Sequence, residues 1–195
     1  GHATLVVMSG MPAAGATSVA ANLALAFAAA DERVLLIDAN FRRPAMHRVF
    51  ALQEAPGLPD VLAKSRTLAE CAQATTTPNL DLLCAGSKEH RVFERLSTDA
   101  VSEMLAQARS AYDLVLIDVA PVVVGNDAFA LASRCDASLL VVRAMADKRG
   151  MVARIKNELS DHRSELLGVV VNGVKSAAGG YMKRNIQTAH EYQSA

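Results

Sequence analysis

Six short apolar runs constrain the fold of this chain more than any other feature of its sequence. They cover residues 4–8, 34–37, 80–84, 114–117, 138–142 and 167–171. Each run is continuous rather than alternating, which is typical of parallel strands buried on both faces. Helical patterns lie between the runs, at residues 17–30, 97–110, 126–133 and 148–159. This alternation predicts an α/β fold with a doubly wound, mostly parallel sheet in three α/β/α layers.

Composition limits the class of protein. The chain has 195 residues, of which 51% are hydrophobic and 21% charged, so we expect one folded domain over residues 1–195. Its 20 basic and 20 acidic residues balance, which gives no electrostatic case for a nucleic-acid partner. The longest apolar stretch is too short to span a membrane. Three cysteines without CxxC spacing favour a reducing, cytoplasmic compartment. Residues 1–2 look like an expression remnant, and residues 176–195 look like a polar tail.

A glycine-containing loop follows the first predicted strand and leads into the first helix. Gly10, Gly15 and Thr17 match the P-loop pattern G-x-x-x-x-G-K-[ST], but Ala16 occupies the lysine position. The backbone N–H groups of such a loop can hold a phosphate, and Thr17 can offer an oxygen to Mg²⁺. The missing ammonium group is the one that reaches the β and γ phosphates. A preorganised charge of this kind is worth roughly 3–4 kcal/mol in comparable oxyanion sites, so we expect a large loss of turnover.

Two aspartates occupy matching positions at strand ends. Asp38 and Asp118 each follow four apolar residues, so both are expected at the carboxyl edge of the sheet, beside the glycine loop. One of them can hold Mg²⁺ and the other can orient a water or accept a proton. A single aspartate here is more often a helix cap. Two of them together with the loop favour a nucleotide site.

These segments resemble the cytoplasmic kinase domain of bacterial tyrosine autokinases that control capsule and exopolysaccharide synthesis. That family belongs to the deviant Walker ATPases, which include the Min and Par proteins. The resemblance covers nearly the whole chain. It is carried by the loop residues Ser9, Pro12, Gly15, Thr17 and Ser18 with Asn22-Leu23-Ala24, and by the segments LLIDANFRRP (35–44), GLPDVL (57–62), YDLVLIDVAP (112–121) with Asp127-Ala128, VVR (141–143) and GVVVNGV (168–174).

The resemblance implies a role for each candidate residue. Asp38 and Asp118 would be the catalytic carboxylates and, with Thr17, the residues around Mg²⁺. Asn172 would touch the base and Ser18 the α-phosphate of ATP or ADP. Arg42 and Arg43 would contact phosphate or a neighbouring subunit. The other implied residues are the nucleotide-binding Gly10, Pro12, Gly15 and Ala16, and the phospho-acceptor candidates Tyr181 and Tyr192.

The implied partners are a membrane polysaccharide co-polymerase or export protein and further copies of the chain. An association with the membrane through such a partner or through an upstream segment would accompany a cytoplasmic location. No transmembrane segment is expected within residues 1–195.

Several departures from the family pattern point to a degenerate site. Ala16 replaces the lysine, Asn40 replaces an acidic residue, and only Tyr181 and Tyr192 remain of a tyrosine cluster. Together they predict a pseudokinase or scaffold with weak or absent phosphoryl transfer. One alternative is an active tyrosine autokinase or ATPase that uses Asp38 and Asp118 with Mg-ATP, its missing cation coming from Lys148 or from a neighbouring subunit. A second alternative is a nucleotide-gated positioning ATPase of the Min/Par kind.

Overall fold

The computed structural model describes residues 3–87, 92–96, 98–161 and 164–174. In this part of the chain seven strands form one sheet in the order β3-β4-β2-β5-β1-β6-β7. Six of the strands are parallel and β3 is antiparallel to β4. The strands are β1 (Thr4–Ser9), β2 (Val34–Ala39), β3 (Ala72–Ala74), β4 (Leu80–Leu83), β5 (Leu114–Val119), β6 (Ala137–Arg143) and β7 (Glu165–Asn172).

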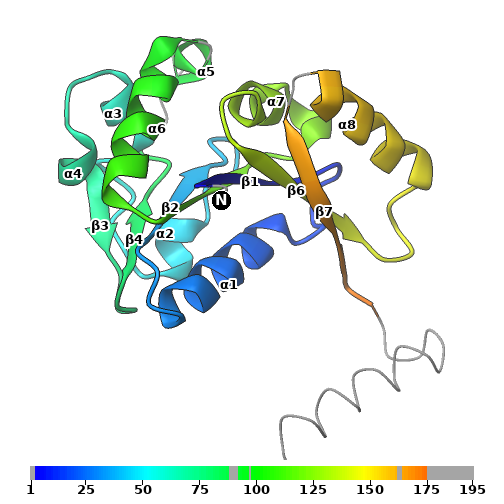
Figure 1. Cartoon of the computed structure of the whole chain (residues 1–195), viewed down its shortest axis with the longest axis horizontal. Coiled ribbons are helices and arrows are strands. Elements are labelled where there is room, and N and C mark those ends of the chain that lie inside the picture. Colours follow the sequence, from blue (N-terminus) through cyan, green and yellow to red (C-terminus); the bar gives the residue numbers. More distant parts are fainter. Residues whose placement is uncertain (1–2, 88–91, 97, 162–163, 175–195) are drawn as a thin grey trace, which may run out of the picture.

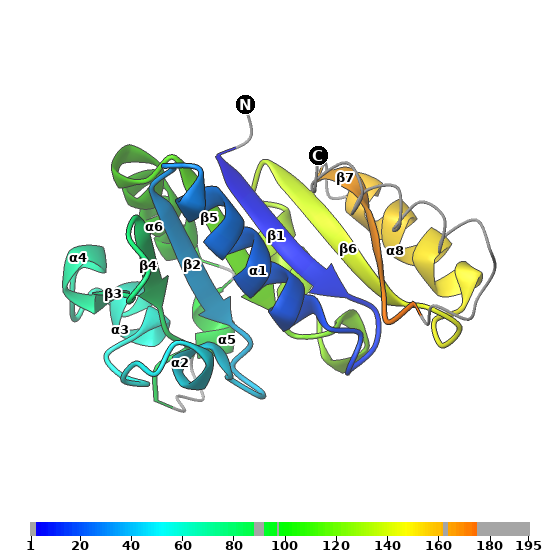
Figure 2. The ribbon, with the colours of Figure 1, turned by 90° about the horizontal axis from the view of Figure 1, so that it is seen from below.

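The helices cover both faces of this sheet (Figure 1). In Figure 2, α1 lies across the central strands, while β6 and β7 lie beside it. The predicted three-layer α/β/α fold is therefore confirmed. The helices are α1 (Ala16–Ala29), α2 (Met46–Val49), α3 (Leu58–Leu62), α4 (Leu68–Cys71), α5 (Val92–Arg95), α6 (Asp99–Ala111), α7 (Asp127–Ala132) and α8 (Arg149–Asp161), with a 3₁₀ turn, η1, at Val122–Val124.

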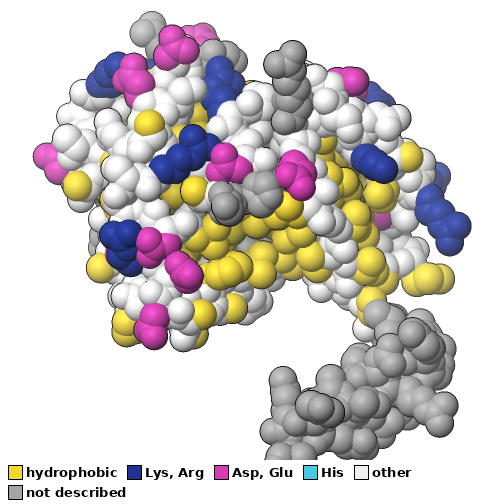
Figure 3. All heavy atoms as spheres, viewed as in Figure 1, with side chains coloured by type: hydrophobic (Ala, Val, Ile, Leu, Met, Phe, Trp, Pro, Cys, Tyr) yellow, Lys and Arg dark blue, Asp and Glu magenta, His cyan; other side chains and the backbone are white. Residues whose placement is uncertain are grey.

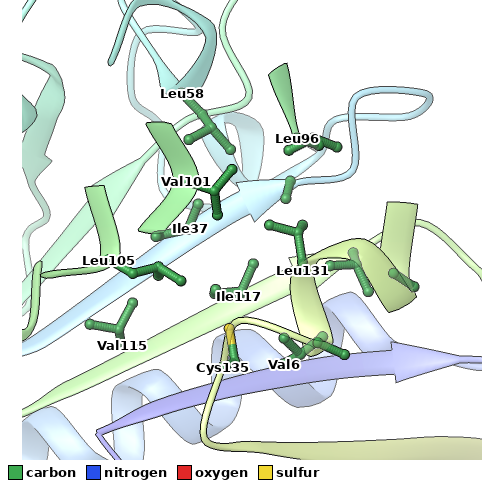
Figure 4. Close-up of a cluster of buried hydrophobic side chains, with 14 of the residues drawn as sticks. Val6, Ile37, Leu58, Leu96, Val101, Leu105, Val115, Ile117, Leu131 and Cys135 are labelled. Carbon is green, nitrogen blue, oxygen red and sulfur yellow. The ribbon is translucent and has the colours of Figure 1, made fainter. Parts of the chain in front are cut away.

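Each face of the sheet has its own apolar core. One core packs strand residues such as Ile37 and Ile117 against Val101 of α6 and Leu131 of α7 (Figure 4). The opposite core packs Ala20 and Ala24 of α1, both fully buried, against the sheet. Alanine has the highest helix propensity, and its small side chain lets α1 lie close to the strands. The helix is thus held rigidly, with its amino end at the carboxyl edge of the sheet.

All six predicted strands and the four longer helices are present. No periodic signal indicated β3, which has three residues of sequence AQA, or the four- and five-residue helices α2 to α5. Such short segments have too few residues to show a period. No helix in the described ranges is long and apolar enough to cross a membrane.

The outer strand β7 differs from the expectation of burial on both faces. Leu167, Val169 and Val171 are 46%, 43% and 53% exposed. In the described sheet β7 is hydrogen-bonded only to β6. Its sequence is as apolar as that of an interior strand, but it has a neighbouring strand on one side only. Figure 3 shows hydrophobic side chains gathered across the middle of one face, over the region of β1, β6 and β7.

Candidate functional site

The two strand-end aspartates lie side by side at the carboxyl edge of the sheet. Asp38 and Asp118 are direct register partners in the parallel pair β2 and β5. Their exposed fractions are 0% and 1%. Both positions follow from the apolar runs that precede them, because these runs bring the carboxyl-terminal ends of the two parallel strands to the same edge. The predicted juxtaposition of the two carboxylates is therefore observed.

Asp38 accepts three backbone hydrogen bonds. Its Oδ1 accepts the Asn40 N–H at 3.0 Å, and its Oδ2 accepts the N–H groups of Ala45 and Met46, both at 3.0 Å. Burial raises the pKa of Asp38, and these hydrogen bonds partly offset the effect because they favour the ionised form. Asp38 thus caps the amino end of α2 and fixes the loop between β2 and α2.

Asp118 has the opposite environment. Neither of its carboxylate oxygens, both fully buried, accepts a hydrogen bond of normal geometry from a described residue. Burial raises the pKa of Asp118 to about 8; the nearby Thr17 hydroxyl opposes this shift and the Asp38 carboxylate adds to it. A buried carboxylate without donors is costly, and a cation would satisfy it.

The residues present suit Mg²⁺ rather than a metal held entirely by protein. The described residues contain no cluster of three or more His, Cys, Asp or Glu side chains suited to a metal ion. Mg²⁺ commonly binds through one or two carboxylates together with substrate phosphates and water. Asp118 and the Thr17 hydroxyl, which lies beside it, are the groups that would hold this ion.

The glycine loop presents backbone N–H groups at the start of α1. Gly15 is the N-cap residue in the left-handed conformation (φ 94°), and α1 has neither a side-chain cap nor an acidic residue in its first turn. Its first N–H groups are therefore available to an anion. A side chain at position 15 would overlap the amide of Asn172, which donates to the Ala14 carbonyl at 2.9 Å. Asn172 therefore braces the loop from the end of β7.

A cavity of about 400 Å³ lies between this loop and the β2–α2 loop. The candidate residues that line it are Pro12, Gly15, Ala16, Thr17, Arg42 and Arg43. No lysine and no acidic residue is found in its described lining. Besides the residues already named, the wall consists of Ser9, Ala13, Ala14, Asn40, Ala45, Arg48, Val119, Pro121 and Val124.

The remaining candidates lie elsewhere. Gly10 lines a neighbouring cavity of about 750 Å³, and so does Lys148, which therefore does not take the place of the missing lysine in this part of the structure. Ser18 is exposed on α1 and is not part of the cavity wall, and neither is Asn172. Tyr181 and Tyr192 lie outside the described residues.

Arg48 is a cavity residue that the sequence analysis missed. It belongs to α2, a four-residue helix with no periodic signal. Its position depends on the hydrogen bonds from the amino end of α2 to Asp38, which are contacts between residues seven and eight positions apart. The run of arginines at 42, 43 and 48 was the available clue, and only the first two were singled out.

Known proteins share this sequence and this arrangement. Residues 7–151 match the model of the AAA domain family. The chain is 35% identical over 172 residues to the tyrosine-protein kinase YwqD of Bacillus subtilis, covering 88% of this chain and 73% of YwqD. It is 32% identical to the tyrosine-protein kinase Wzc of Salmonella typhimurium over 94% of this chain, but this is only 25% of Wzc.

Solved structures agree. The kinase domain of the Escherichia coli tyrosine kinase ETK superposes with a TM-score of 0.86 at 29% identity, covering 91% of this chain and 70% of that domain. The cell division ATPase MinD of Pyrococcus furiosus shares the fold, with a TM-score of 0.79 at 20% identity over 95% of this chain and 79% of MinD. With its P-loop fold, its paired strand-end aspartates and these relatives, the chain belongs to the family of bacterial tyrosine-protein kinases.

Proposed function

We propose that this chain is a pseudokinase that acts as a scaffold or regulator in bacterial exopolysaccharide or capsule synthesis and export, with ATP hydrolysis and phosphoryl transfer weak or absent. The observation that carries the proposal is Ala16. Its side chain is a single methyl group, which belongs to the first turn of α1, packs into the core and is 7% exposed. No lysine is found in its place among the residues of the cavity wall that the structure describes.

The environment of Asp38 supports the same proposal. A general base takes the proton of the reacting hydroxyl on a lone pair that is not used in other hydrogen bonds. Three of the roughly four lone-pair sites of Asp38 already accept backbone N–H groups, two of them at the amino end of α2. In this chain Asp38 is therefore a structural residue of the site, and Asp118 is the carboxylate that remains for a cation.

Magnesium, when bound with a nucleotide, would neutralise charge on the phosphates. Thr17 and Asp118 would hold it. Thr17 lines the cavity, and its hydroxyl lies near the buried carboxylate of Asp118, which is not itself part of the described cavity wall. Binding of Mg²⁺ at this position requires the ionised form of Asp118, so the affinity for Mg²⁺ rises with pH.

The proposed cellular setting follows from the shared motifs. A polysaccharide co-polymerase or export protein in the membrane is the proposed partner, and the domain would lie on the cytoplasmic side. Self-association is the second proposed interaction.

An active autokinase is the competing function, and one observation favours it. Asp118 is kept as a bare, buried carboxylate at a cost to stability, which is typical of a working metal site. In that case Tyr181 or Tyr192 would receive the phosphoryl group, with bond formation from the tyrosine oxygen to the γ-phosphorus and release of ADP.

Turnover measurements on the native chain and on Ala16→Lys separate the two functions. We expect the native chain to release no phosphate from Mg-ATP and to incorporate none on tyrosine. Ala16→Lys should gain at least tenfold in phosphate release, and Asp118→Asn in the Ala16→Lys background should abolish the gain. Mg²⁺-dependent turnover by the native chain that disappears in Asp118→Asn would overturn the proposal. Dimerisation only with ATP and Mg²⁺ would instead indicate a positioning ATPase.

A further inference from the structure

Three arginines make the candidate nucleotide cavity strongly cationic in a chain that has no net charge. Arg42, Arg43 and Arg48 line it, and no Asp or Glu belongs to its described wall. All three come from the β2–α2 loop and α2, on the side of the cavity away from the glycine loop. Arginine forms paired hydrogen bonds with phosphate oxygens and stays charged at any physiological pH.

Arg42 is already committed to protein contacts. Its Nη2 donates to Asp127 Oδ2 at 3.2 Å, and its guanidinium carbon lies 4.9 Å from the centre of the Phe93 ring. The ion pair with Asp127 offsets the charge of Arg42, and the contact with the Phe93 ring restricts the orientation of the guanidinium group. We therefore regard Arg42 as a wall of the cavity and not as its main source of positive charge.

Arg43 and Arg48 are available to a ligand. Neither forms an ion pair with any residue that the structure describes. Arg48 donates one hydrogen bond from Nη2 to the Pro44 carbonyl at 2.9 Å, which orients the side chain and leaves its other N–H groups unused. Asp38 fixes α2, so the backbone that carries Arg48 is held in place.

We propose that Arg43 and Arg48 supply the positive charge that Ala16 does not, so that this cavity binds the diphosphate group of ADP or ATP without a P-loop lysine. The cavity volume of about 400 Å³ falls within the range of small-ligand sites. The inference rests on the proposed function and deepens it: the nucleotide is bound, but its phosphoryl group is not transferred.

The location of the two arginines explains why binding and transfer separate. The P-loop lysine reaches the β and γ phosphates, where charge develops during transfer. Arg43 and Arg48 come from the β2–α2 loop and α2 instead of the P-loop. An interaction that is equally strong in the ground and transition states lowers Kd without raising the rate, and this is the role that we assign to the two arginines.

Calorimetric titration of the full chain tests this directly. The probes are ADP, ATP, inorganic pyrophosphate and adenosine, with Mg²⁺ present. The variants are Arg43→Ala, Arg48→Ala and the double variant, and Arg66→Ala is the matched control because it removes one positive charge from an exposed position in the α3–α4 connection, outside this cavity. Thermal unfolding of each variant shows that the fold is kept.

We expect the native chain to bind ADP and pyrophosphate but not adenosine. Each single variant should weaken ADP binding about tenfold or more, and the double variant about a hundredfold or more, as for lost hydrogen bonds to charged groups. Arg66→Ala should bind as the native chain does, and Arg48→Lys should keep part of the affinity that Arg48→Ala loses.

Three outcomes would overturn the inference: no binding of ADP or pyrophosphate by the native chain, unchanged affinity in the double variant, or an equal loss in Arg66→Ala. A different result would contradict the proposed function. If the native chain binds ADP through the arginines and also turns over Mg-ATP, the inference stands and the pseudokinase assignment does not.

Discussion

The two edges of the sheet place contrasting aspartates next to the interior strand β1. At the amino edge, Asp136 accepts hydrogen bonds from the Ala3 and Thr4 N–H groups and the Thr4 hydroxyl at 2.8–2.9 Å. Arg109 adds a fourth donor at 3.1 Å. Burial would raise the pKa of Asp136, but the Thr4 hydrogen bonds and the Arg109 charge outweigh it and hold this pKa below its usual value.

At the carboxyl edge, Asp118 is buried, accepts no hydrogen bond of normal geometry from a described residue, and has its pKa raised to about 8 by burial, against the opposing effect of the nearby Thr17 hydroxyl. An aspartate side chain thus stabilises the fold at the amino edge, where it accepts hydrogen bonds, and destabilises it at the carboxyl edge, where it does not. The contrast shows how to distinguish a structural carboxylate from a functional one. The structural carboxylate accepts hydrogen bonds from the protein, whereas the functional one is buried without them and can bind a cation.

The largest expected effect is the pH dependence of Asp118→Asn. In the folded chain this carboxyl has a pKa of about 8, and in the unfolded chain the value is near 4. The folded state keeps a proton that the unfolded state loses, so the unfolding free energy of the native chain falls between about pH 4 and pH 8, by at most about 1.4 kcal/mol per pH unit. Urea unfolding of both proteins across this range should show their difference widening with pH and levelling off above pH 8. If the unfolding free energies of the two proteins changed with pH in the same way, the Asp118 carboxyl would not have a raised pKa in the folded chain.

Asp136→Ala is expected to have the next largest effect. Thr4 is fully buried, and the variant leaves its N–H and hydroxyl without their acceptor. We expect a loss of about 3 kcal/mol in the unfolding free energy at pH 7. The same denaturant titration measures it, and nucleotide affinity should change little because the site lies at the other edge. A stability equal to that of the native chain would show that the hydrogen bonds at the amino edge contribute nothing.

Asp38→Ala sharpens the comparison because Asp38 lies at the functional edge but is hydrogen-bonded like Asp136. We expect a loss of about 2 kcal/mol, since three backbone N–H groups lose their acceptor while the cost of a buried charge is also relieved. Pyrophosphate affinity should fall as well, because α2 carries Arg48. If the variant kept full stability but bound pyrophosphate more weakly, the hydrogen bonds of Asp38 would not stabilise the fold, and Asp38 would resemble Asp118 rather than Asp136.

The smallest expected effect is that of Arg33→Ala. Arg33 pairs with Asp113 at 2.7 Å on the exposed surface at the amino edge, and this pairing lowers the pKa of Asp113 to about 2. Exposed ion pairs contribute little to stability because solvent screens them. Thermal unfolding should therefore be unchanged within error, and a clear drop in the melting temperature would show that the amino edge depends on its surface charges too.

The sequence predicted those parts of the site that depend on long, regular elements. The apolar runs before Asp38 and Asp118 defined two neighbouring strands, and the edge position of both carboxylates follows from strand polarity. The different hydrogen bonding of the two residues was not predictable, because the donors to Asp38 include residues of α2, a helix without a periodic signal. Arg48 was missed for the same reason.

Asn172 shows a second limit. Its position at the end of an apolar strand was expected, but its contact with the Ala14 carbonyl joins segments at the two ends of the described chain. No local pattern reports such a contact. The exposure of β7 was not predictable either, because a run of valines has the same sequence pattern in an interior strand and in an outer one.

The interior place of β1 in the sheet has a consequence for the order of assembly. Among the described strands β1 comes first in the sequence, yet its neighbours β5 and β6 begin at Leu114 and Ala137. Pairing over such long separations forms slowly, because a large loop must close first. The glycine loop follows β1 directly, so it acquires its native surroundings only after the chain as far as β6 has been made.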